Sequence, residues 1–255
     1  MNNKNLIYSM ENKNYKLTNG EYKVIRGVLH EKQISTLRKL ADENLKTQEA
    51  RPLYICKQQK LGKQIIERYQ QSGLKDLLRS CHPWLKNNIG DQWLILSHKF
   101  LLRRTWPLSE HAARRMGHNA SNLTWHQDSN PTHKSKPMIV IMVFLQNNAG
   151  YSRPGLSIID ANTEKFEGVY GYEGNRIDEL EKKIIKQHGE LRIRSPLSHA
   201  GDVIIFNGLT FHRTYSNSKM TKHRDALLLR IVNPIHIANF QPGPHLKTHE
   251  KFFAS

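Results

Sequence analysis

Several residue types and patterns are scarce in this chain, and each shortage excludes a class of protein. There are only 2 cysteines among 255 residues, so a disulfide framework is not expected. The longest apolar run, MIVIMVFL at residues 138–145, is far shorter than the roughly 20 residues of a membrane-spanning helix. The N-terminal segment also lacks the apolar run of a signal peptide. We therefore expect a soluble cytoplasmic protein with no membrane span.

Nucleotide-binding and repeat signatures are missing as well. The sequence contains neither a GxGxxG motif nor a P-loop, so nothing in it supports chemistry with a nucleotide cofactor. It has no internal repeat and no low-complexity segment. Hydrophobic residues make up only 38% of the chain, which means that the core must be concentrated in particular segments. A chain of this length is long for one domain, but β-rich barrels and sandwiches reach it.

Acidic residues are the other shortage. There are 22 Asp and Glu against 39 Lys and Arg, which gives a net charge of +17 and a pI of about 9.9. This balance favours anionic partners, namely nucleic acid, acidic carrier proteins, or substrates with phosphate, sulfate or carboxylate groups. The basic residues are spread along the whole chain, and aromatic residues, which stack on bases, make up only 8%. Nucleic acid is therefore a weaker prediction than a small anionic molecule.

The front of the chain is predicted to be mostly helical. Residues 22–29 have the composition of a strand, and apolar residues recur at helical spacing over 31–46 and again over 62–79. After residue 90 the pattern changes to short segments rich in β-branched and aromatic residues, bounded by Gly, Pro, Asn or Ser. One further helix is predicted at 177–188. The eight predicted strands are 93–104, 122–127, 137–146, 155–160, 190–196, 202–207, 209–215 and 225–232.

This order of elements predicts a mainly β protein with flanking helices and a jelly-roll core. We expect one domain over residues 1–255, whose parts differ in role. Residues 105–121 form a long, polar and basic connection, and a loop of that length is usually functional or disordered. The expected parts are a loose N-terminus at 1–20, a helical buttress at 21–90, the jelly-roll core at 91–233 and a C-terminal tail at 234–255.

The stretch TWHQDSNP, residues 124–131, raises the question of a metal site. Residues i and i+2 of a strand point to the same side, so His126 and Asp128 could both face one ion. Non-haem Fe(II) oxygenases bind iron through two histidines and one carboxylate. Alone, a His-x-Asp pair belongs more often to a polar loop. A metal site needs a third ligand from a distant strand.

Residues 200–232 supply a candidate for that ligand. Residues 200–202, Ala-Gly-Asp, predict a turn into a buried strand. Asn207-Gly208 is a strong hairpin signal and leads to a second strand that carries His212. A polar connection then leads to a final strand that opens with Arg224.

These segments together resemble the phytanoyl-CoA dioxygenase-like family of Fe(II)/2-oxoglutarate oxygenases. The family's WHxD motif matches residues 125–128, its PGL segment matches 154–156, and its Gly-Asp strand matches 201–207. The family's histidine, hydroxyl residue and arginine then follow in order. The front segment 22–40 is also similar to the strand and helix that open these proteins. The resemblance covers residues 22–232 and implies the same double-stranded β-helix, or cupin-like jelly roll.

The resemblance implies a role for each matching residue. His126, Asp128 and His212 would bind Fe(II), and Arg224 with Thr214 would bind the C5 carboxylate of 2-oxoglutarate, because a guanidinium matches a carboxylate at two points. With O2 as oxidant, such an enzyme hydroxylates a C–H bond. The intact His-x-Asp argues against a halogenase, in which a small residue replaces the acid.

One departure from the family leaves an alternative open. The family often has Arg-x-Ser on the cosubstrate strand, whereas this chain has Ala226 at the third position, so one hydroxyl contact is missing. Arg230 lies on the same strand with the same parity as Arg224. It is the alternative partner of the 2-oxoglutarate carboxylate, although the spacing from His212 favours Arg224.

The predicted function is hydroxylation of a small molecule, including anionic ones, in a biosynthetic pathway. Arg104, Arg115 and Trp125 are candidates for contact with the substrate; the alternatives are solvated charge for the arginines and a core or rim position for the tryptophan. Two other functions stay open. One is the same chemistry on a nucleic acid or a carrier-bound substrate. The other is a basic binding protein without catalysis on the same fold.

Overall fold

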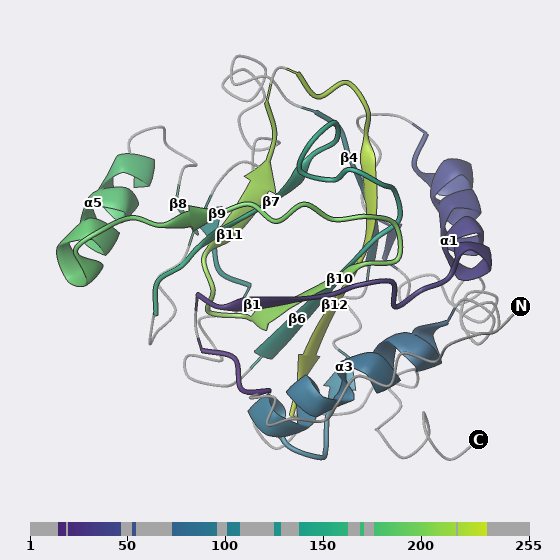
Figure 1. Cartoon of the computed structure of the whole chain (residues 1–255), viewed down its shortest axis with the longest axis horizontal. Coiled ribbons are helices and arrows are strands. Elements are labelled where there is room, and N and C mark those ends of the chain that lie inside the picture. The colour runs from purple at the N-terminus through teal and green to yellow at the C-terminus, as the bar shows by residue number, and fades with distance from the viewer. Residues whose placement is uncertain are drawn as a thin grey trace, which may run out of the picture.

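Two antiparallel β-sheets face each other in the computed structural model of the chain (Figure 1). Helices α1, α3 and α5 flank the sheets in the described part of the chain. None of the described helices has the length and apolar character to cross a bilayer. The structure describes residues 15–18, 20–46, 53–54, 73–95, 101–107, 125–128, 138–162, 169–170, 176–217 and 219–233.

The larger sheet has the strand order β1-β10-β6-β12-β4-β2, and β3 also pairs with β12. Its centre is the pair β6 and β12, whose register runs from Phe144 opposite Ala226 to Met138 opposite Val232. Every residue of β6 is buried, as its continuous apolar run requires. The strands are β1 (Tyr22–Ile25), β2 (Leu53–Tyr54), β3 (Leu94–Ile95), β4 (Leu101–Thr105), β6 (Met138–Phe144), β10 (Val203–Asn207) and β12 (Arg224–Val232).

The smaller sheet has the order β8-β5-β11-β7-β9. Alternation along its strands divides the side chains between two faces: Ile158 of β7 packs inward against the larger sheet, and Ile159 packs outward. The inner layer also contains Val140, Phe144 and Phe206 of the larger sheet. The strands are β5 (Trp125–His126), β7 (Gly155–Ile159), β8 (Val169–Tyr170), β9 (Ile193–Arg194) and β11 (His212–Tyr215).

Helices α1 (Glu31–Asn44) and α3 (Leu74–Ile89) cover the outer face of the larger sheet. The apolar stripe of α1 that the sequence predicts is buried, and Ile34 and Leu37 belong to the same core cluster as Ile141 of β6. The helix predicted over 31–46 is therefore confirmed. Of the helix predicted at 62–79, residues 62–72 lie outside the described part. The rest belongs to α3, which continues to Ile89 with Pro83 inside it.

Helix α5 (Arg176–His188) lies on the other side of the molecule from α1 (Figure 1). Its Leu180 and Ile184 pack on the outer face of the smaller sheet, against Trp125, Ile159 and Phe211. This confirms the helix predicted at 177–188. Each of the eight predicted strands also overlaps an observed strand. The prediction of a mainly β chain with flanking helices and a jelly-roll core is thus confirmed.

The hairpin predicted at Asn207-Gly208 is wrong. Strand β10 belongs to the larger sheet and β11 to the smaller one, so the turn carries the chain from one sheet to the other. The reason is that both edges of β10 are already occupied, by β1 and by β6. The turn is closed locally, since the Thr210 amide donates to the Asn207 carbonyl at 2.9 Å. Local turn chemistry specifies the reversal but not the partner strand.

The turn predicted at residues 200–202 is present and tightly packed. Gly201 has φ +86°, and a Cβ atom there would lie 2.3 Å from the Leu29 carbonyl oxygen. The Leu29 and Val28 amides both donate to the Gly201 carbonyl. The buried Asp202 carboxylate accepts from the Gly27 amide at 3.0 Å and from Arg26. The turn therefore joins the β1–α1 connection to the start of β10.

The predicted division of the chain stays a prediction. Residues 234–255 and most of 1–20 lie outside the described residues. Within 21–90, β1 and β2 are strands of the larger sheet itself, so this segment contributes to the core as well as covering it.

Candidate active site

The three predicted metal ligands lie together on the inner face of the smaller sheet. His212 of β11 is the cross-strand partner of His126 in β5, and partners in register point to the same face. Asp128 follows two residues after His126. One ligand atom from each residue lies within 4.8 Å of the others, and the two imidazole centroids are 4.2 Å apart. The sheet register thus gathers a two-histidine, one-carboxylate set.

His212 is held with one ring nitrogen facing the other two residues. Its Nδ1 lies 3.0 Å from the Thr210 carbonyl oxygen, so Nδ1 carries the proton and donates. Its Nε2 lies 3.6 Å from Oδ2 of Asp128. Burial is the main cause that lowers the pKa of His212 to about 3, and His126 lowers it further. The imidazole is therefore neutral at pH 7, with a lone pair on Nε2.

Asp128 has one oxygen bound and one oxygen available. Arg230 donates from Nη2 to Oδ1 at 2.7 Å, while the buried Oδ2 has no hydrogen-bond partner among the described residues. Burial alone would raise the pKa of Asp128, but Arg230 and the two histidines outweigh it and hold the pKa well below its usual range. Arg230 neutralises the carboxylate through Oδ1, and the unpartnered Oδ2 beside two imidazoles remains available to a metal ion. The donor set fits a divalent transition metal such as Fe(II).

Arg224 enters the same cavity from the start of β12. Its Nη1 donates to the Gly155 carbonyl at 2.6 Å and its Nη2 to Oγ1 of Thr105 at 3.1 Å. Burial and the nearby Arg103 lower the pKa of Arg224 to about 9, so the group still carries its charge at pH 7. Its Nε has no partner in the described part of the chain. The side chain is fixed by neutral acceptors and has donors left for an anion.

Arg230 has a different position from Arg224. The two residues are six positions apart on one strand, about 20 Å between Cα atoms at 3.3 Å per residue, and share its inner face. Arg230 contacts the predicted metal ligand Asp128 directly, whereas Arg224 contacts β7 and β4. Thr214, two residues after His212 on β11, also faces this space. We call it the inner cavity; it is lined by Arg103, His126, Asp128, Val140, Met142, Leu156, Phe206, His212, Thr214, Arg224, Leu228 and Arg230.

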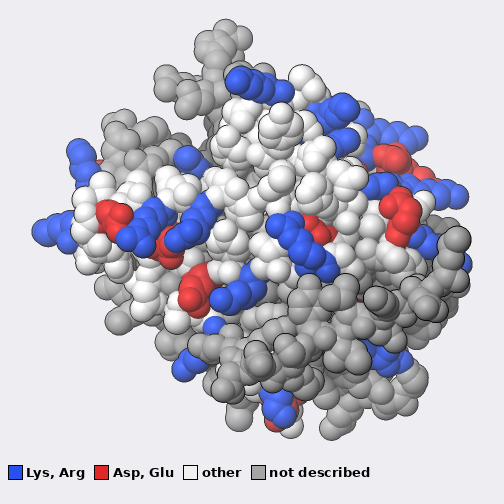
Figure 2. All heavy atoms as spheres, viewed as in Figure 1, with Lys and Arg blue, Asp and Glu red and all other residues white. Residues whose placement is uncertain are grey.

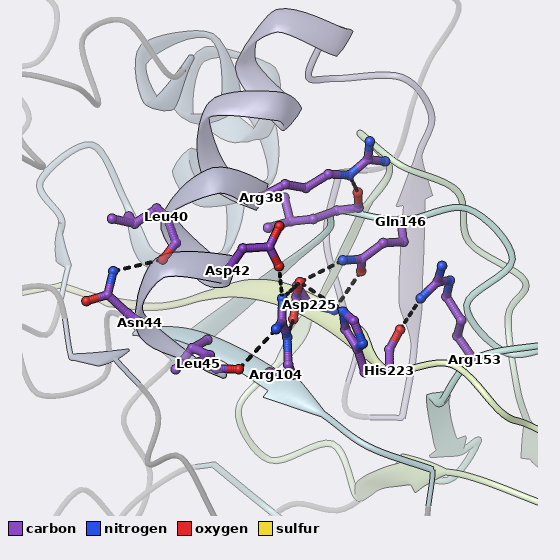
Figure 3. A network of polar contacts seen from close by, with 11 residues as sticks. Arg38, Leu40, Asp42, Asn44, Leu45, Arg104, Gln146, Arg153, His223 and Asp225 are labelled. Carbon is purple, nitrogen blue, oxygen red and sulfur yellow. Dashed lines mark hydrogen bonds and ion pairs between the residues drawn. The ribbon is translucent and has the colours of Figure 1, made fainter. Parts of the chain in front are cut away.

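Arg104, predicted as a substrate contact, does not line the inner cavity. It is the cross-strand partner of Asp225, and both side chains lie on the outer face of the larger sheet, beneath α1 (Figure 3). Its Nε and Nη2 donate to the two Asp225 oxygens at 2.7 and 2.8 Å, and it also binds Asp42 of α1. These contacts give Arg104 a structural role, because they join α1 to the sheet.

Arg103, and not the predicted Arg104, is the arginine of this adjacent pair that lines the inner cavity. It is the cross-strand partner of Ala226, so it shares the inner face with Arg224 and lines the inner cavity. Strand alternation requires that only one of two adjacent arginines points inward. The signal that separates them is Asp225, the acid in register with Arg104, and it can be used only once the strand register is known.

Trp125, another predicted substrate contact, lies on the outer face of the smaller sheet, away from the inner cavity. Its ring is fully buried with Ile159, Phe211 and Leu180 beneath α5, and the Arg213 guanidinium stacks 4.4 Å from its centroid. Because His126 points inward, its neighbour Trp125 must point outward. Trp125 is therefore a core residue. Arg115 lies outside the described residues.

A second group of ligand-type side chains, Asp42, His223 and Asp225, lies on the outer face of the larger sheet. Both oxygens of Asp225 accept hydrogen bonds from Arg104, and Oδ2 also accepts one from Gln146 at 2.7 Å. Figure 3 shows these groups gathered around Asp225. Arg104 already neutralises the buried carboxylate, so this group lacks the available oxygen that Asp128 has.

Comparison with known proteins finds structures that share the fold but no relative in sequence. No protein-family model matches the sequence, and no curated protein matches it significantly. Among solved structures, the alpha-ketoglutarate-dependent epimerase SnoN from nogalamycin biosynthesis matches with a TM-score of 0.55 and 11% identity over 91% of this chain and 94% of its own. The carbocyclase SnoK from the same biosynthesis has a TM-score of 0.56 and 12% identity, over 89% and 91%. EctD from S. alaskensis matches with a TM-score of 0.53 and 16% identity, over 88% of this chain and 76% of its own.

The chain has the jelly-roll fold of these proteins. The identities are too low to carry more than the fold. What the chain does must therefore be argued from the inner cavity.

Proposed function

We propose that the chain is an Fe(II)- and 2-oxoglutarate-dependent oxygenase that hydroxylates a C–H bond of a small molecule. The observation that carries the proposal is the unpartnered Oδ2 of Asp128 facing two imidazoles, in one cavity with a buried, charged arginine. A metal explains the first feature and a carboxylate of the cosubstrate explains the second. The motif resemblance to phytanoyl-CoA dioxygenase-like proteins is part of this proposal.

In the proposed site, His126, Asp128 and His212 hold Fe(II). The hydrogen bond from His212 Nδ1 to the Thr210 carbonyl fixes the tautomer that leaves Nε2 for the metal. Arg230 holds Oδ1 of Asp128, so Oδ2 is the oxygen that would be left for the metal. The bound iron supplies oxidation of the substrate by O2, coupled to conversion of 2-oxoglutarate to succinate and carbon dioxide.

Arg224 and Thr214 hold the C5 carboxylate of 2-oxoglutarate. This carboxylate is at the far end of the cosubstrate from the atoms that bind the metal, so its partner must lie away from the metal ligands. Arg230 hydrogen-bonds a metal ligand and is too close. Arg224 is fixed by the Gly155 carbonyl and Thr105. Its Nε and the second Nη2 proton can bind a carboxylate at two points.

The structural neighbours support a small-molecule substrate within this proposal. SnoN and SnoK are described as an epimerase and a carbocyclase of nogalamycin biosynthesis, and EctD is described with 2-oxoglutarate and 5-hydroxyectoine. Different outcomes therefore occur on this fold. A small molecule also suits the surface, because on the face in Figure 2 basic side chains are interspersed with acidic ones and do not form one continuous track.

The test is an anaerobic titration with Fe(II) and then 2-oxoglutarate, followed by visible absorption. The wild type should develop the metal-to-ligand charge-transfer band of a chelated 2-oxoglutarate. His126→Ala should lose it, and the control His188→Ala, which changes an exposed histidine on α5, should keep it. Absence of the band in a folded wild type would reject the proposed function.

A further inference from the structure

The inner cavity contains more positive charge than the proposed reaction needs. Arg103, Arg224 and Arg230 line it, and Asp128 is its only acidic side chain among the described residues. The two histidines add no charge when neutral. Counting Arg224 and Arg230 alone, two guanidinium cations and one carboxylate leave a surplus of one positive charge. Fe(II) adds two more and the 2-oxoglutarate dianion removes two, so the surplus persists when the cofactor and cosubstrate are both bound.

Part of this surplus positive charge lies on Arg230, which has N–H donors available for an anion. Its side chain is only 9% exposed, yet Nε and Nη1 have no hydrogen-bond partner among the described residues. Only Nη2 has one, the Oδ1 atom of Asp128. Leaving donors of a buried cation unbound is costly. The role of holding Asp128 requires one of the five N–H groups of Arg230 and does not account for the others.

We propose that the substrate carries an anionic group, a carboxylate or a phosphate, which Arg230 binds through one of its unpartnered N–H groups beside the metal. This inference rests on the proposed function and adds the chemical class of the substrate. Arg224 is assigned to the cosubstrate, so Arg230 is the cavity arginine with donors left over. The guanidinium that orients Asp128 therefore also orients the substrate relative to the iron.

The buried position of Arg230 should make the site select anionic molecules over neutral ones. A neutral molecule of the same shape would leave the Arg230 donors buried and unpaired, and a site built around such donors rejects the analogue that lacks the partner group. Each charge-assisted hydrogen bond is worth about tenfold or more in affinity. The anion should therefore bind at least tenfold more tightly than its neutral analogue.

The experiment measures binding of matched anionic and neutral probes, by calorimetry under nitrogen, to protein loaded with Fe(II) and saturating 2-oxoglutarate. Saturation keeps Arg224 occupied. The probe pairs are acetate with acetamide, and methyl phosphate with trimethyl phosphate; they distinguish a carboxylate from a phosphate. The wild type should prefer at least one anion by tenfold or more. Arg230→Met should abolish this preference.

The control is Arg213→Met, which removes the same charge from the outer face of the smaller sheet, where Arg213 stacks on Trp125. It should keep the anion preference. If Arg230→Met does not load Fe(II), Arg230→Lys decides: it retains the charge beside Asp128, and its preference should fall several-fold. Equal binding of anions and neutral analogues by the wild type, or a preference that survives the Arg230 substitution, overturns the inference. Absence of the charge-transfer band in the wild type rejects the proposed function instead.

Discussion

At the scale of single residues, two arginines of strand β12 differ in the groups that bind them. Arg224 is held by neutral acceptors on β7 and β4, and Arg230 is held by the carboxylate of Asp128. Both are buried. Their partners favour the proposed cosubstrate role for Arg224 over Arg230, which strand parity alone could not do.

Arg224→Met is expected to weaken 2-oxoglutarate binding about a hundredfold, which is about 3 kcal/mol, because it removes two charge-assisted hydrogen bonds. Fe(II) affinity should change little, since Arg224 does not contact the three predicted ligands. Anaerobic titration of the charge-transfer band measures both constants, and Arg213→Met is the control for lost charge. Unchanged 2-oxoglutarate affinity in a folded Arg224→Met protein would assign the carboxylate to another residue.

His223 gives a prediction for stability against pH. Burial lowers the pKa of His223 in the folded protein, although Asp225 partly opposes this. Below the unfolded pKa of about 6.5 the unfolded chain binds a proton that the folded chain does not. The free energy of unfolding should therefore fall as the pH decreases below about 6.5. Urea titrations from pH 7.5 to 5.0 should show a smaller decrease for His223→Gln, and an equal decrease in both proteins would contradict the assignment.

At the scale of elements, the periodicity of the sequence predicted what each segment forms better than what it pairs with. The apolar stripe over 31–46 correctly predicted helix α1, because one face of this helix is buried. The apolar run at 138–145 correctly predicted strand β6, because both faces of this strand are buried. The turn at Asn207-Gly208 was recognised, but its hairpin was wrong, since the partners of β10 come from residues 22–25 and 138–144. Likewise, Arg103 and Arg104 are equivalent in sequence and differ only through the register of β4 with β12.

The turn that opens β10 offers a test at this scale. Gly201→Ala should destabilise the protein by more than about 2 kcal/mol, because it combines a positive φ with a Cβ that would meet the Leu29 carbonyl. Gly189→Ala is the matched control: Gly189 has φ +78° and nothing within 4 Å of the added Cβ. Its cost should be about 1 kcal/mol. Urea midpoints compare the two variants, and equal costs would show that the packing at Leu29 is unimportant.

At the scale of the whole molecule, the sequence predicted the fold and the grouping of the three candidate metal ligands more fully than it predicted the residues facing a substrate. His126, Asp128 and His212 could be found because their spacing and order are a motif. The substrate side could not, since Trp125 and Arg104 point away from the inner cavity for reasons of register and core packing. The net charge of +17 indicated an anionic partner, but only the position of Arg230 suggests where in the molecule such a group would bind.

The basic and acidic side chains interspersed on the face in Figure 2 predict only weak, salt-dependent binding of nucleic acid there. A single-stranded DNA 20-mer should bind with a Kd no tighter than about 10⁻⁶ M at physiological salt, and log Kd should increase linearly with log salt concentration. Arg230→Met should leave this binding unchanged, because Arg230 is buried. Fluorescence anisotropy at several salt concentrations measures it. Tight, salt-resistant binding that depends on the cavity arginines would instead favour a nucleic-acid substrate.

The most direct test of the central claim is a crystal structure of the protein with Mn(II), as a stand-in for Fe(II), and 2-oxoglutarate. The account predicts an anomalous peak bound by His126, by Oδ2 of Asp128 and by Nε2 of His212. It also predicts the C5 carboxylate of 2-oxoglutarate on Arg224, with Arg230 still on Oδ1 of Asp128. A metal at Asp42, His223 and Asp225, or the C5 carboxylate on Arg230, would contradict it.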